Sequence, residues 1–351
     1  MTPFTYSGLP CRVIFGSGTL SQLPAEVDRL ALKRVMVLAT PQQKAEAERI
    51  ATLIGDRAAC VFAGAVMHTP VDVTEHALSW ATKTRADGTI AIGGGSTIGL
   101  GKAIALRTDH PQIVVPTTYA GSEMTPILGQ AKDGVKTIQR TLKVLPETVV
   151  YDVDLTMTLP ANMSGTSGIN AIAHAVEALY AQDRSPVISL MAEDGIRTLA
   201  GALPRIVRDP QDRGARADAL YGAWLCGICL GSVGMALHHK LCHTLGGSFD
   251  LPHAETHTVV LPHAVAYNTA AAPGAMAAVA RALGVTDAAA GLYDLAGAAG
   301  AKRALRDLGM PESGIDRAAD IAMANPYWNP RPLERQAIRD LIARAWAGER
   351  P

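Results

Sequence analysis

The chain contains 351 residues, more than a single domain usually has, and we therefore expect two domains. Hydrophobic residues account for 48% of it and charged residues for 18%, with 32 basic and 32 acidic side chains. This composition argues against a disordered chain and against a protein that binds nucleic acid. The five cysteines are scattered and the N-terminal sequence does not resemble a signal peptide, so we expect a cytoplasmic protein.

The first half alternates short apolar runs with helix-like stretches. Four runs are rich in valine or isoleucine and are followed by turn residues, which predicts strands at 35–40, 88–94, 113–118 and 148–152. After Pro160 the periodicity is helical to the end, with breaks indicated by glycine and proline near 201–214, 272–274 and 325–332. We predict an α/β domain with a parallel sheet over residues 1–158 and an all-α domain over residues 159–351.

The strand predicted at 88–94 leads into a glycine-rich turn. Residues 93–97 read Gly-Gly-Gly-Ser-Thr and precede an apolar helical stretch. A strand, a glycine turn and a helix N-terminus together form a phosphate site, because the first N–H groups of the helix are free and glycine permits close approach. Ile98 replaces the third glycine of the Rossmann fingerprint, so this is a different motif. We interpret it as a diphosphate-binding turn, with an ordinary structural turn as the alternative.

Two further segments fit a dinucleotide. Thr117, Thr118 and Ser122 follow the strand predicted at 113–118, and their hydroxyls can bind a ribose or a phosphate, although such residues also occur in ordinary turns. Thr40 ends the strand predicted at 35–40, where a carboxylate would bind the ribose 2′-OH of NADH. Because Thr40 is neutral, NADH and NADPH both stay open as coenzymes.

The second half begins with a predicted helix that carries polar residues on one face. Asn170 and His174 are four residues apart and Glu177 follows three residues later, so all three share that face. Farther on, Ala219–Leu237 contains no charged residue and is long enough to cross a membrane. Its glycines and the histidines at its end argue against a membrane span, and we predict a buried core helix.

Six of the ten histidines lie between positions 238 and 263. His239 and His243 are four residues apart on a predicted helix that ends at Gly246-Gly247, and His253 and His257 follow after a short loop. A single buried histidine is usually a structural residue. Polar residues are otherwise scarce in this half, however, and we therefore predict a functional cluster.

Three imidazoles and a carboxylate would suit a divalent metal, but position 170 is an asparagine. A neutral amide is a poor ligand for such a cation, so we expect metal to bind weakly or not at all. Cys226 and Cys229 form a single CxxC inside the apolar stretch, for which we predict no zinc or redox role. Cys242 is predicted to be a helix-packing residue.

Several motifs together resemble the iron-containing alcohol dehydrogenase family, and within it the maleylacetate reductase branch. The likeness extends from FGSG at 15–18 to NPYWNPRPL at 325–333. The motifs are GGGST (93–97), PTTYAGSE (116–123), YDVDLTMTLP (151–160), SGINAIAHAVEALY (167–180) and HKLCHTLGGSFDLPHAETHTVVLPHAVAYN (239–268).

The resemblance implies an NAD(P)H-binding α/β domain and a helical catalytic domain, the dehydroquinate synthase-like fold, commonly in a homodimer. The residues that correspond to the family's metal ligands are Asn170, His174, His239 and His253, and His243 corresponds to the histidine beside the nicotinamide. The asparagine favours the maleylacetate reductase branch and a reaction that does not require metal. The implied coenzyme site comprises Thr40, Gly94, Gly95, Ser96, Thr117, Thr118, Ser122 and Leu155.

The branch implies reduction of maleylacetate to 3-oxoadipate in aromatic-compound degradation of the resorcinol, chlorocatechol or hydroxyquinol type. Adding hydride to a double bond conjugated to a ketone places charge on an enolate oxygen, which hydrogen-bond donors can stabilise. The expected catalytic residues are Asn170, His174, His239, His243 and His253. Lys240 and Arg331 are candidates for binding the carboxylates of the keto-dicarboxylate.

Three other functions remain open at this point. A metal-dependent alcohol or polyol dehydrogenase of the same family would use the metal as a Lewis acid. A carbocycle-forming synthase resembling dehydroquinate synthase would recycle NAD without net consumption of NADH. A non-catalytic binding protein would not turn over any keto-acid. We expect no nucleic-acid or membrane partner for any of them.

Overall fold

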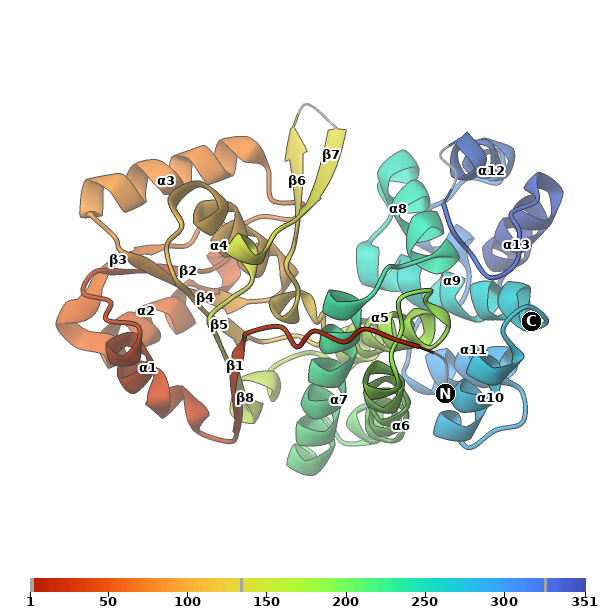
Figure 1. Ribbon diagram of the computed structural model, residues 1–351, viewed down its shortest axis with the longest axis horizontal. Coiled ribbons are helices and arrows are strands. Elements are labelled where there is room, and N and C mark those ends of the chain that lie inside the picture. Colours follow the sequence, from red (N-terminus) through yellow and green to blue (C-terminus); the bar gives the residue numbers. More distant parts are fainter. Residues whose placement is uncertain (1–2, 133–134, 325–326) are drawn as a thin grey trace. The chain divides into compact units, whose positions relative to one another are not determined.

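The computed structural model describes residues 3–132, 135–324 and 327–351, and its chain divides into two compact units (Figure 1). We call Gly8–Leu159 the α/β unit. The helical unit is Pro160–Pro351 together with the described residues before Gly8. The observed boundary lies between Leu159 and Pro160, one residue after the boundary predicted between residues 158 and 159. The described residues before Gly8 differ from the prediction, because they group with the helical unit and not with the α/β unit.

The α/β unit is built on a six-stranded parallel sheet in the order β1-β8-β5-β4-β2-β3. The four predicted strands are confirmed, and they are the four inner strands, which consist entirely of buried residues. Sequence patterns missed the two edge strands. The strands are β1 (Arg12–Gly16), β2 (Val35–Leu38), β3 (Ala58–Phe62), β4 (Gly88–Gly93), β5 (Gln112–Pro116) and β8 (Thr148–Asp152).

Helices cover the sheet of the α/β unit. An apolar cluster joins α1 and α2 to alternate residues of the strands, among them Val37, Ile90 and Ile113. A separate two-stranded antiparallel sheet, which the sequence did not predict, follows β5. The helices are α1 (Leu23–Arg29), α2 (Lys44–Ile54), α3 (Val71–Thr84) and α4 (Gly95–Thr108), and the added strands are β6 (Ile127–Lys132) and β7 (Val135–Arg140).

The helical unit contains no strand within its described residues, which confirms the prediction for the second half. Its central helix, α5 (Ala161–Tyr180), is buried continuously from Ser164 to Tyr180. The other helices are α6 (Pro186–Arg208), α7 (Arg213–Ser232), α8 (Leu237–Phe249), α9 (His253–Asn268), α10 (Pro273–Leu283), α11 (Ala288–Ala298), α12 (Gly314–Ala324) and α13 (Arg335–Ala347).

The break predicted near 201–214 is confirmed, because α6 ends at Arg208 and α7 begins at Arg213. Gly201 and Pro204 themselves lie inside α6, because its buried face packs along α5 and α7 and outweighs the local cost of proline. The predicted end of α8 is wrong. The helix α8 continues through Gly246 and Gly247 to Phe249, which packs against the apolar core. Asn325 and Pro326, which belong to another predicted break, lie outside the described residues.

The apolar stretch predicted as one buried helix is divided. The helix α7 ends at Ser232, and α8 begins at Leu237 at an angle of 94°. Residues Pro273–Ala298 also have the length and composition of a membrane span, but 50% of their most apolar stretch of 18 residues is buried inside the protein. They are split between α10 and α11, each of which has 11 residues, fewer than a span needs.

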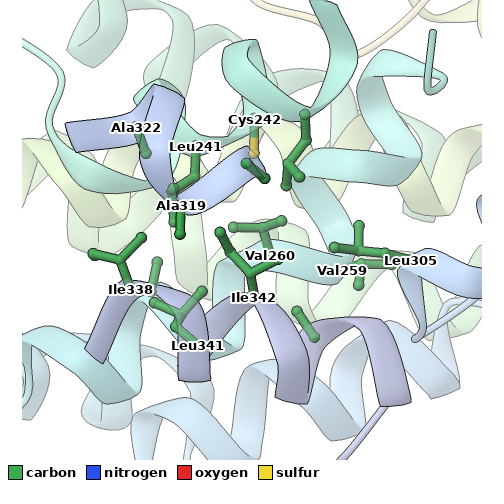
Figure 2. Packing of buried hydrophobic residues seen from close by; sticks show 14 of the residues in the cluster. Leu241, Cys242, Val259, Val260, Leu305, Ala319, Ala322, Ile338, Leu341 and Ile342 are labelled. Carbon is green, nitrogen blue, oxygen red and sulfur yellow. The ribbon is translucent and has the colours of Figure 1, made fainter. Parts of the chain in front are cut away.

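The helices α8, α9, α12 and α13 meet at a buried apolar cluster, which Figure 2 shows at close range. Leu241 and Cys242 of α8 pack there beside Val259 and Val260 of α9. The prediction that Cys242 is a packing residue is thereby confirmed. The cluster fixes α8 and α9 against each other, and the histidines project from other faces of these two helices.

Candidate active site

The glycine turn has a backbone that only glycine can adopt. Gly93, at the end of β4, has φ +148°, and a Cβ there would lie 2.6 Å from Thr97 Oγ1 and 2.7 Å from Gln43 Oε1. A Cβ on Gly94 would lie 3.0 Å from Thr118 Cγ2. The helix α4 begins at Gly95, and no described side chain caps its N-terminus. The positive end of α4 is therefore open to an anion.

Hydroxyl groups surround this helix end. The Ser122 Oγ lies 4.0 Å from the position that a Cβ on Gly95 would take. The Ser122 and Thr97 hydroxyls are buried and have no hydrogen-bond partner among the residues that the structure describes. Thr117 donates its backbone N–H to the Gly93 carbonyl at 3.0 Å. The structure thus brings together six predicted coenzyme residues: Gly94, Gly95, Ser96, Thr117, Thr118 and Ser122.

Gln43 joins this group without having been predicted. Its Nε2 donates to Thr117 Oγ1 at 2.9 Å, while its Oε1 faces the Gly93 turn. Thr40 lies two residues beyond β2, just before the 3-10 turn Pro41–Gln43. Residues 39–43 contain no carboxylate. Leu155, after β8, is partly buried against the apolar cluster of the sheet and has no polar side-chain atom.

A fully buried carboxylate organises the site of the helical unit. Glu177 lies with Asn170 and His174 on α5, as predicted, and all three are buried. It accepts hydrogen bonds from the backbone N–H groups of Ala236 and His238, at 2.9 and 2.8 Å, where α8 begins. Burial alone would raise its pKa, but the His239 hydrogen bond and the charges nearby lower that pKa to about 2. Glu177 is therefore an anion at neutral pH.

The four histidines predicted to be catalytic form one cluster, which also includes His257, predicted with His253, and His238. His174 of α5 and His239 of α8 have ring centroids 5.1 Å apart. His253 is the first residue of α9 and His257 lies one turn later, with ring centroids 4.2 Å apart. The remaining neighbouring centroids are separated by 4.9 to 6.4 Å: His238–His257, His239–His257, His238–His239, His243–His253, His243–His257 and His239–His243.

The hydrogen bonds fix the tautomers of two of these rings. His239 Nδ1 donates to the Glu177 carboxylate at 2.7 Å, and His239 Nε2 has no partner within the described part of the chain. His238 Nε2 donates to the His257 carbonyl at 2.9 Å. Burial, followed by repulsion from His239, lowers the pKa of His238 to about 4. Burial and neighbouring imidazoles hold the pKa values of His174 and His257 well below the usual range.

The residues can hold a divalent metal only without an anionic ligand. His174, His239 and His253 offer imidazoles, and the buried Asn170 Oδ1 lacks a partner among the described atoms. The imidazole nitrogens of this donor set suit Fe²⁺ or Zn²⁺, but none of the four ligands carries a negative charge to balance the cation. The nearby anion is Glu177, and its carboxylate is hydrogen-bonded to His239 instead of facing the metal. A second trio, His238, His239 and His257, has candidate ligand atoms within 4.8 Å of one another, but His238 Nε2 is already bonded.

The two cations proposed for the carboxylates differ in their surroundings. Lys240 is exposed on α8 between His239 and His243, with its ammonium 5.5 Å from the centroid of the Tyr327 ring. The Arg331 guanidinium stacks on the Tyr267 ring at 4.2 Å and donates to the Tyr267 carbonyl at 3.4 Å. Arg331 therefore has a structural role, and Lys240 is the better candidate.

The CxxC cysteines lie in the interior of the helical unit. Cys226 and Cys229 of α7 are free and buried. Burial raises the pKa of Cys229 to about 12 and holds the pKa of Cys226 well above its usual range. Both remain thiols at neutral pH, a form that neither attacks disulfides nor binds metal well.

Comparison with known proteins gives full-length similarities. Residues 10–153 match the iron-containing alcohol dehydrogenase family profile, and residues 164–346 match the profile of the Fe-containing alcohol dehydrogenase family, C-terminal. A maleylacetate reductase of Burkholderia cepacia is 56% identical over 351 residues, all of both chains.

Solved structures show the same likeness. A maleylacetate reductase from Agrobacterium tumefaciens has a TM-score of 0.97 and 56% identity over all of both chains. An iron-containing alcohol dehydrogenase from Corynebacterium glutamicum has a TM-score of 0.94 and 43% identity, covering 98% of this chain and 97% of its own.

Proposed function

The chain belongs to the iron-containing alcohol dehydrogenase family, and we propose that it is an oxidoreductase that reduces maleylacetate to 3-oxoadipate with NADH or NADPH. Full-length relatives named maleylacetate reductase support the substrate. The observation that carries the mechanism is the buried pair of Glu177 and His239. It holds beside His174 an imidazole nitrogen that has no partner among the described residues.

The open N-terminus of α4 fits the coenzyme diphosphate. Glycine at positions 93 and 94 leaves room for it, and the Thr97 and Ser122 hydroxyls, which lack partners among the described residues, can donate to its oxygens. Thr40 carries no charge that would repel a 2′-phosphate, so the proposal includes both coenzymes.

The reaction transfers a hydride from the reduced nicotinamide to the carbon–carbon double bond of maleylacetate. The electrons of that double bond move onto the ketone oxygen and form an enolate. A proton is then added to the carbon beside the carbonyl, which restores the ketone and completes 3-oxoadipate. The enzyme must stabilise the enolate oxygen and supply that proton.

The histidine cluster can perform both tasks. When both nitrogens of His239 are protonated, its Nδ1–H donates to the Glu177 carboxylate and its Nε2–H can donate to the enolate oxygen. Asn170, one turn from His174 on α5, offers the N–H groups of its amide as further donors. His243 and His253 lie at the less buried side of the cluster and are candidates for moving the proton. Lys240, exposed on the same helix, is the candidate for one substrate carboxylate.

We further propose that the reaction does not require metal, because position 170 is an amide. If a metal is bound, His174, His239, His253 and Asn170 would hold it, and it would polarise the substrate carbonyl. The same chemistry makes a metal-dependent alcohol dehydrogenase the second candidate function. The similarity to the Corynebacterium iron-containing alcohol dehydrogenase favours it.

We also propose a cytoplasmic homodimer. The five free cysteines support a reducing compartment. Light scattering after size-exclusion chromatography tests the dimer, and a mass of 36.8 kDa would contradict it.

The test of the function is the loss of NADH or NADPH absorbance with maleylacetate as substrate. We expect turnover with release of 3-oxoadipate, before and after exhaustive treatment with EDTA. If the enzyme instead turns over an alcohol or aldehyde, and this activity is lost after chelation and restored by Fe²⁺ or Zn²⁺, the protein is the metal-dependent dehydrogenase. Coenzyme that cycles without net consumption would select a synthase.

A further inference from the structure

Lys102 is a buried lysine in the helix that begins at the glycine turn. It lies seven residues after Gly95 on α4, so both residues are on the same face of the helix. The residue is 2% exposed. The α/β unit thus contains a cation in its interior, close in sequence to the diphosphate site. A buried cation must be compensated by hydrogen bonds or it destabilises the fold.

The compensation comes from one short segment, Ser122–Ile127. The Lys102 Nζ donates to the Ser122 carbonyl at 2.6 Å and to the Ile127 carbonyl at 3.0 Å. It also donates to the Thr125 carbonyl at 2.7 Å and the Thr125 hydroxyl at 2.9 Å. A single ammonium group therefore bridges both ends of the segment that connects the loop after β5 to β6.

This segment carries one wall of the diphosphate site. The Ser122 carbonyl accepts from Lys102, and the hydroxyl of the same residue faces the Gly95 end of α4. That hydroxyl has no partner within residues 3–132, 135–324 and 327–351. The segment's own hydrogen bonds to this carbonyl, from Thr125 N and Thr125 Oγ1 at 3.2 and 3.0 Å, are longer than the bond from Lys102.

Other charged groups near Lys102 do not replace these contacts. Burial lowers the pKa of Lys102 to about 7, while the Glu123 charge opposes that shift. The Glu123 carboxyl is buried and accepts a hydrogen bond from the Tyr151 hydroxyl at 2.8 Å. Burial raises the pKa of Glu123. The backbone oxygens of the segment are thus the principal acceptors of the ammonium hydrogens.

We propose that Lys102 is a positioning residue for the coenzyme, holding Ser122–Ile127 so that the Ser122 hydroxyl and the N-terminus of α4 bind the same diphosphate. The inference rests on the proposed function, because it presumes a dinucleotide at the glycine turn. Lys102 itself does not touch the reacting atoms. It acts through Ser122.

A double-mutant cycle on coenzyme binding tests this. The Kd of NADH is measured by fluorescence without maleylacetate for the wild type, Lys102→Met, Ser122→Ala and the double variant. We expect Lys102→Met to weaken NADH and ADP-ribose alike by about 10-fold or more, since hydrogen bonds to charged groups are lost. If Lys102 acts through Ser122, the double variant binds NADH no more weakly than Lys102→Met alone.

The control is Lys143→Met, which removes an exposed lysine of the same unit and should leave NADH affinity unchanged. The KM for maleylacetate at saturating NADH should change by less than about 2-fold in Lys102→Met, since substrate contacts remain intact. If Lys102→Met does not fold, Thr125→Val takes the place of Lys102→Met in the cycle, because it removes the Thr125 hydroxyl that accepts from the ammonium. A smaller loss of affinity that is again non-additive with Ser122→Ala is then expected.

The outcomes separate the two proposals. Wild type that binds neither NADH nor NADPH overturns the proposed function. Two results would overturn only the positioning role, provided that the wild type binds NADH. One is an unchanged NADH affinity in Lys102→Met, and the other is a double variant in which the losses of binding free energy from Lys102→Met and Ser122→Ala simply add. A lower melting temperature with unchanged NADH affinity would assign Lys102 to stability alone.

Discussion

The His239 Nδ1–H donates to the Glu177 carboxylate across 2.7 Å, and both residues are buried. The same carboxylate binds the backbone N–H groups where α8 begins. One anion on α5 therefore sets both the position of α8 and the tautomer of its histidine. Carboxylate–histidine pairs of this kind commonly orient an imidazole toward a ligand.

Replacing Glu177 with Gln should lower kcat/KM for maleylacetate by about 10- to 100-fold, because His239 loses its charged partner. The Kd of NADH should not change, since the glycine turn lies in the other unit. Tyr180→Phe is the matched control, as it removes a 3.1 Å hydrogen bond to the same carboxylate, together with a hydrogen bond to the Asn268 side chain, and leaves the pair with His239 in place. An equal loss in both variants would mean that packing, and not the pair with His239, is responsible.

Changing Asn170 to Asp should create the anionic ligand that the histidine cluster lacks. We expect the purified variant to retain close to one equivalent of Fe²⁺ or Zn²⁺ after dialysis and the wild type to retain much less. Elemental analysis measures this independently of activity. Asn162→Asp, at an exposed position on the same helix, is the control. Equal metal content in wild type and Asn170→Asp would refute the role given to the amide.

Thr40→Asp should favour NADH over NADPH. A carboxylate beyond β2 would bind the ribose 2′-OH and repel a 2′-phosphate, so kcat/KM with NADPH should fall by about 10-fold or more. Thr40→Asn, which is close in size but neutral, should leave the ratio near that of wild type. Steady-state kinetics with both coenzymes check this. An unchanged ratio in Thr40→Asp would show that the ribose does not lie at this position.

His263 should make stability depend on pH. Burial, with a contribution from Arg344, lowers its pKa from 6.5 to about 4. Between these values the unfolded chain binds more protons, so the free energy of unfolding falls as the pH decreases from 6.5 to 4, by about 3 kcal/mol in total. Above pH 6.5 this contribution is constant.

Calorimetry between pH 4 and 7 tests the prediction for His263. The stability of His263→Gln should fall less steeply over this range than that of wild type. His76→Gln changes an exposed histidine of α3 and should follow the wild type. Parallel curves for wild type and His263→Gln would show that the ring is not the titrating group.

The inner strands could be predicted from sequence and the edge strands could not, for a physical reason. All four residues of β2 are buried, so its sequence is continuously apolar, whereas the edge strand β1 mixes exposed and buried residues. Helical spacing likewise placed Asn170, His174 and Glu177 on one face. It could not show that the N-terminus of α8 meets that face, because this contact joins residues about 60 positions apart in the chain.

Lys102 and Gln43 were missed for related reasons. A lone lysine within the apolar helix Gly95–Thr108 could have signalled a buried charge, but its acceptors are backbone oxygens that no motif encodes. Gln43 contacts the glycine turn only because β2 and β4 are adjacent in the sheet, although Gln43 and Gly93 are 50 positions apart in the sequence.

The hydroxyls of Thr97 and Ser122, which have no partner in the described part of the chain, also affect how well the enzyme resists proteolysis. Desolvated donors without acceptors destabilise the empty α/β unit, and a bound dinucleotide relieves that penalty. At 100 times its Kd a ligand stabilises the folded state by about 2.7 kcal/mol. Resistance to added protease should therefore rise with the concentration of coenzyme, and in the absence of coenzyme cleavage should begin in the α/β unit.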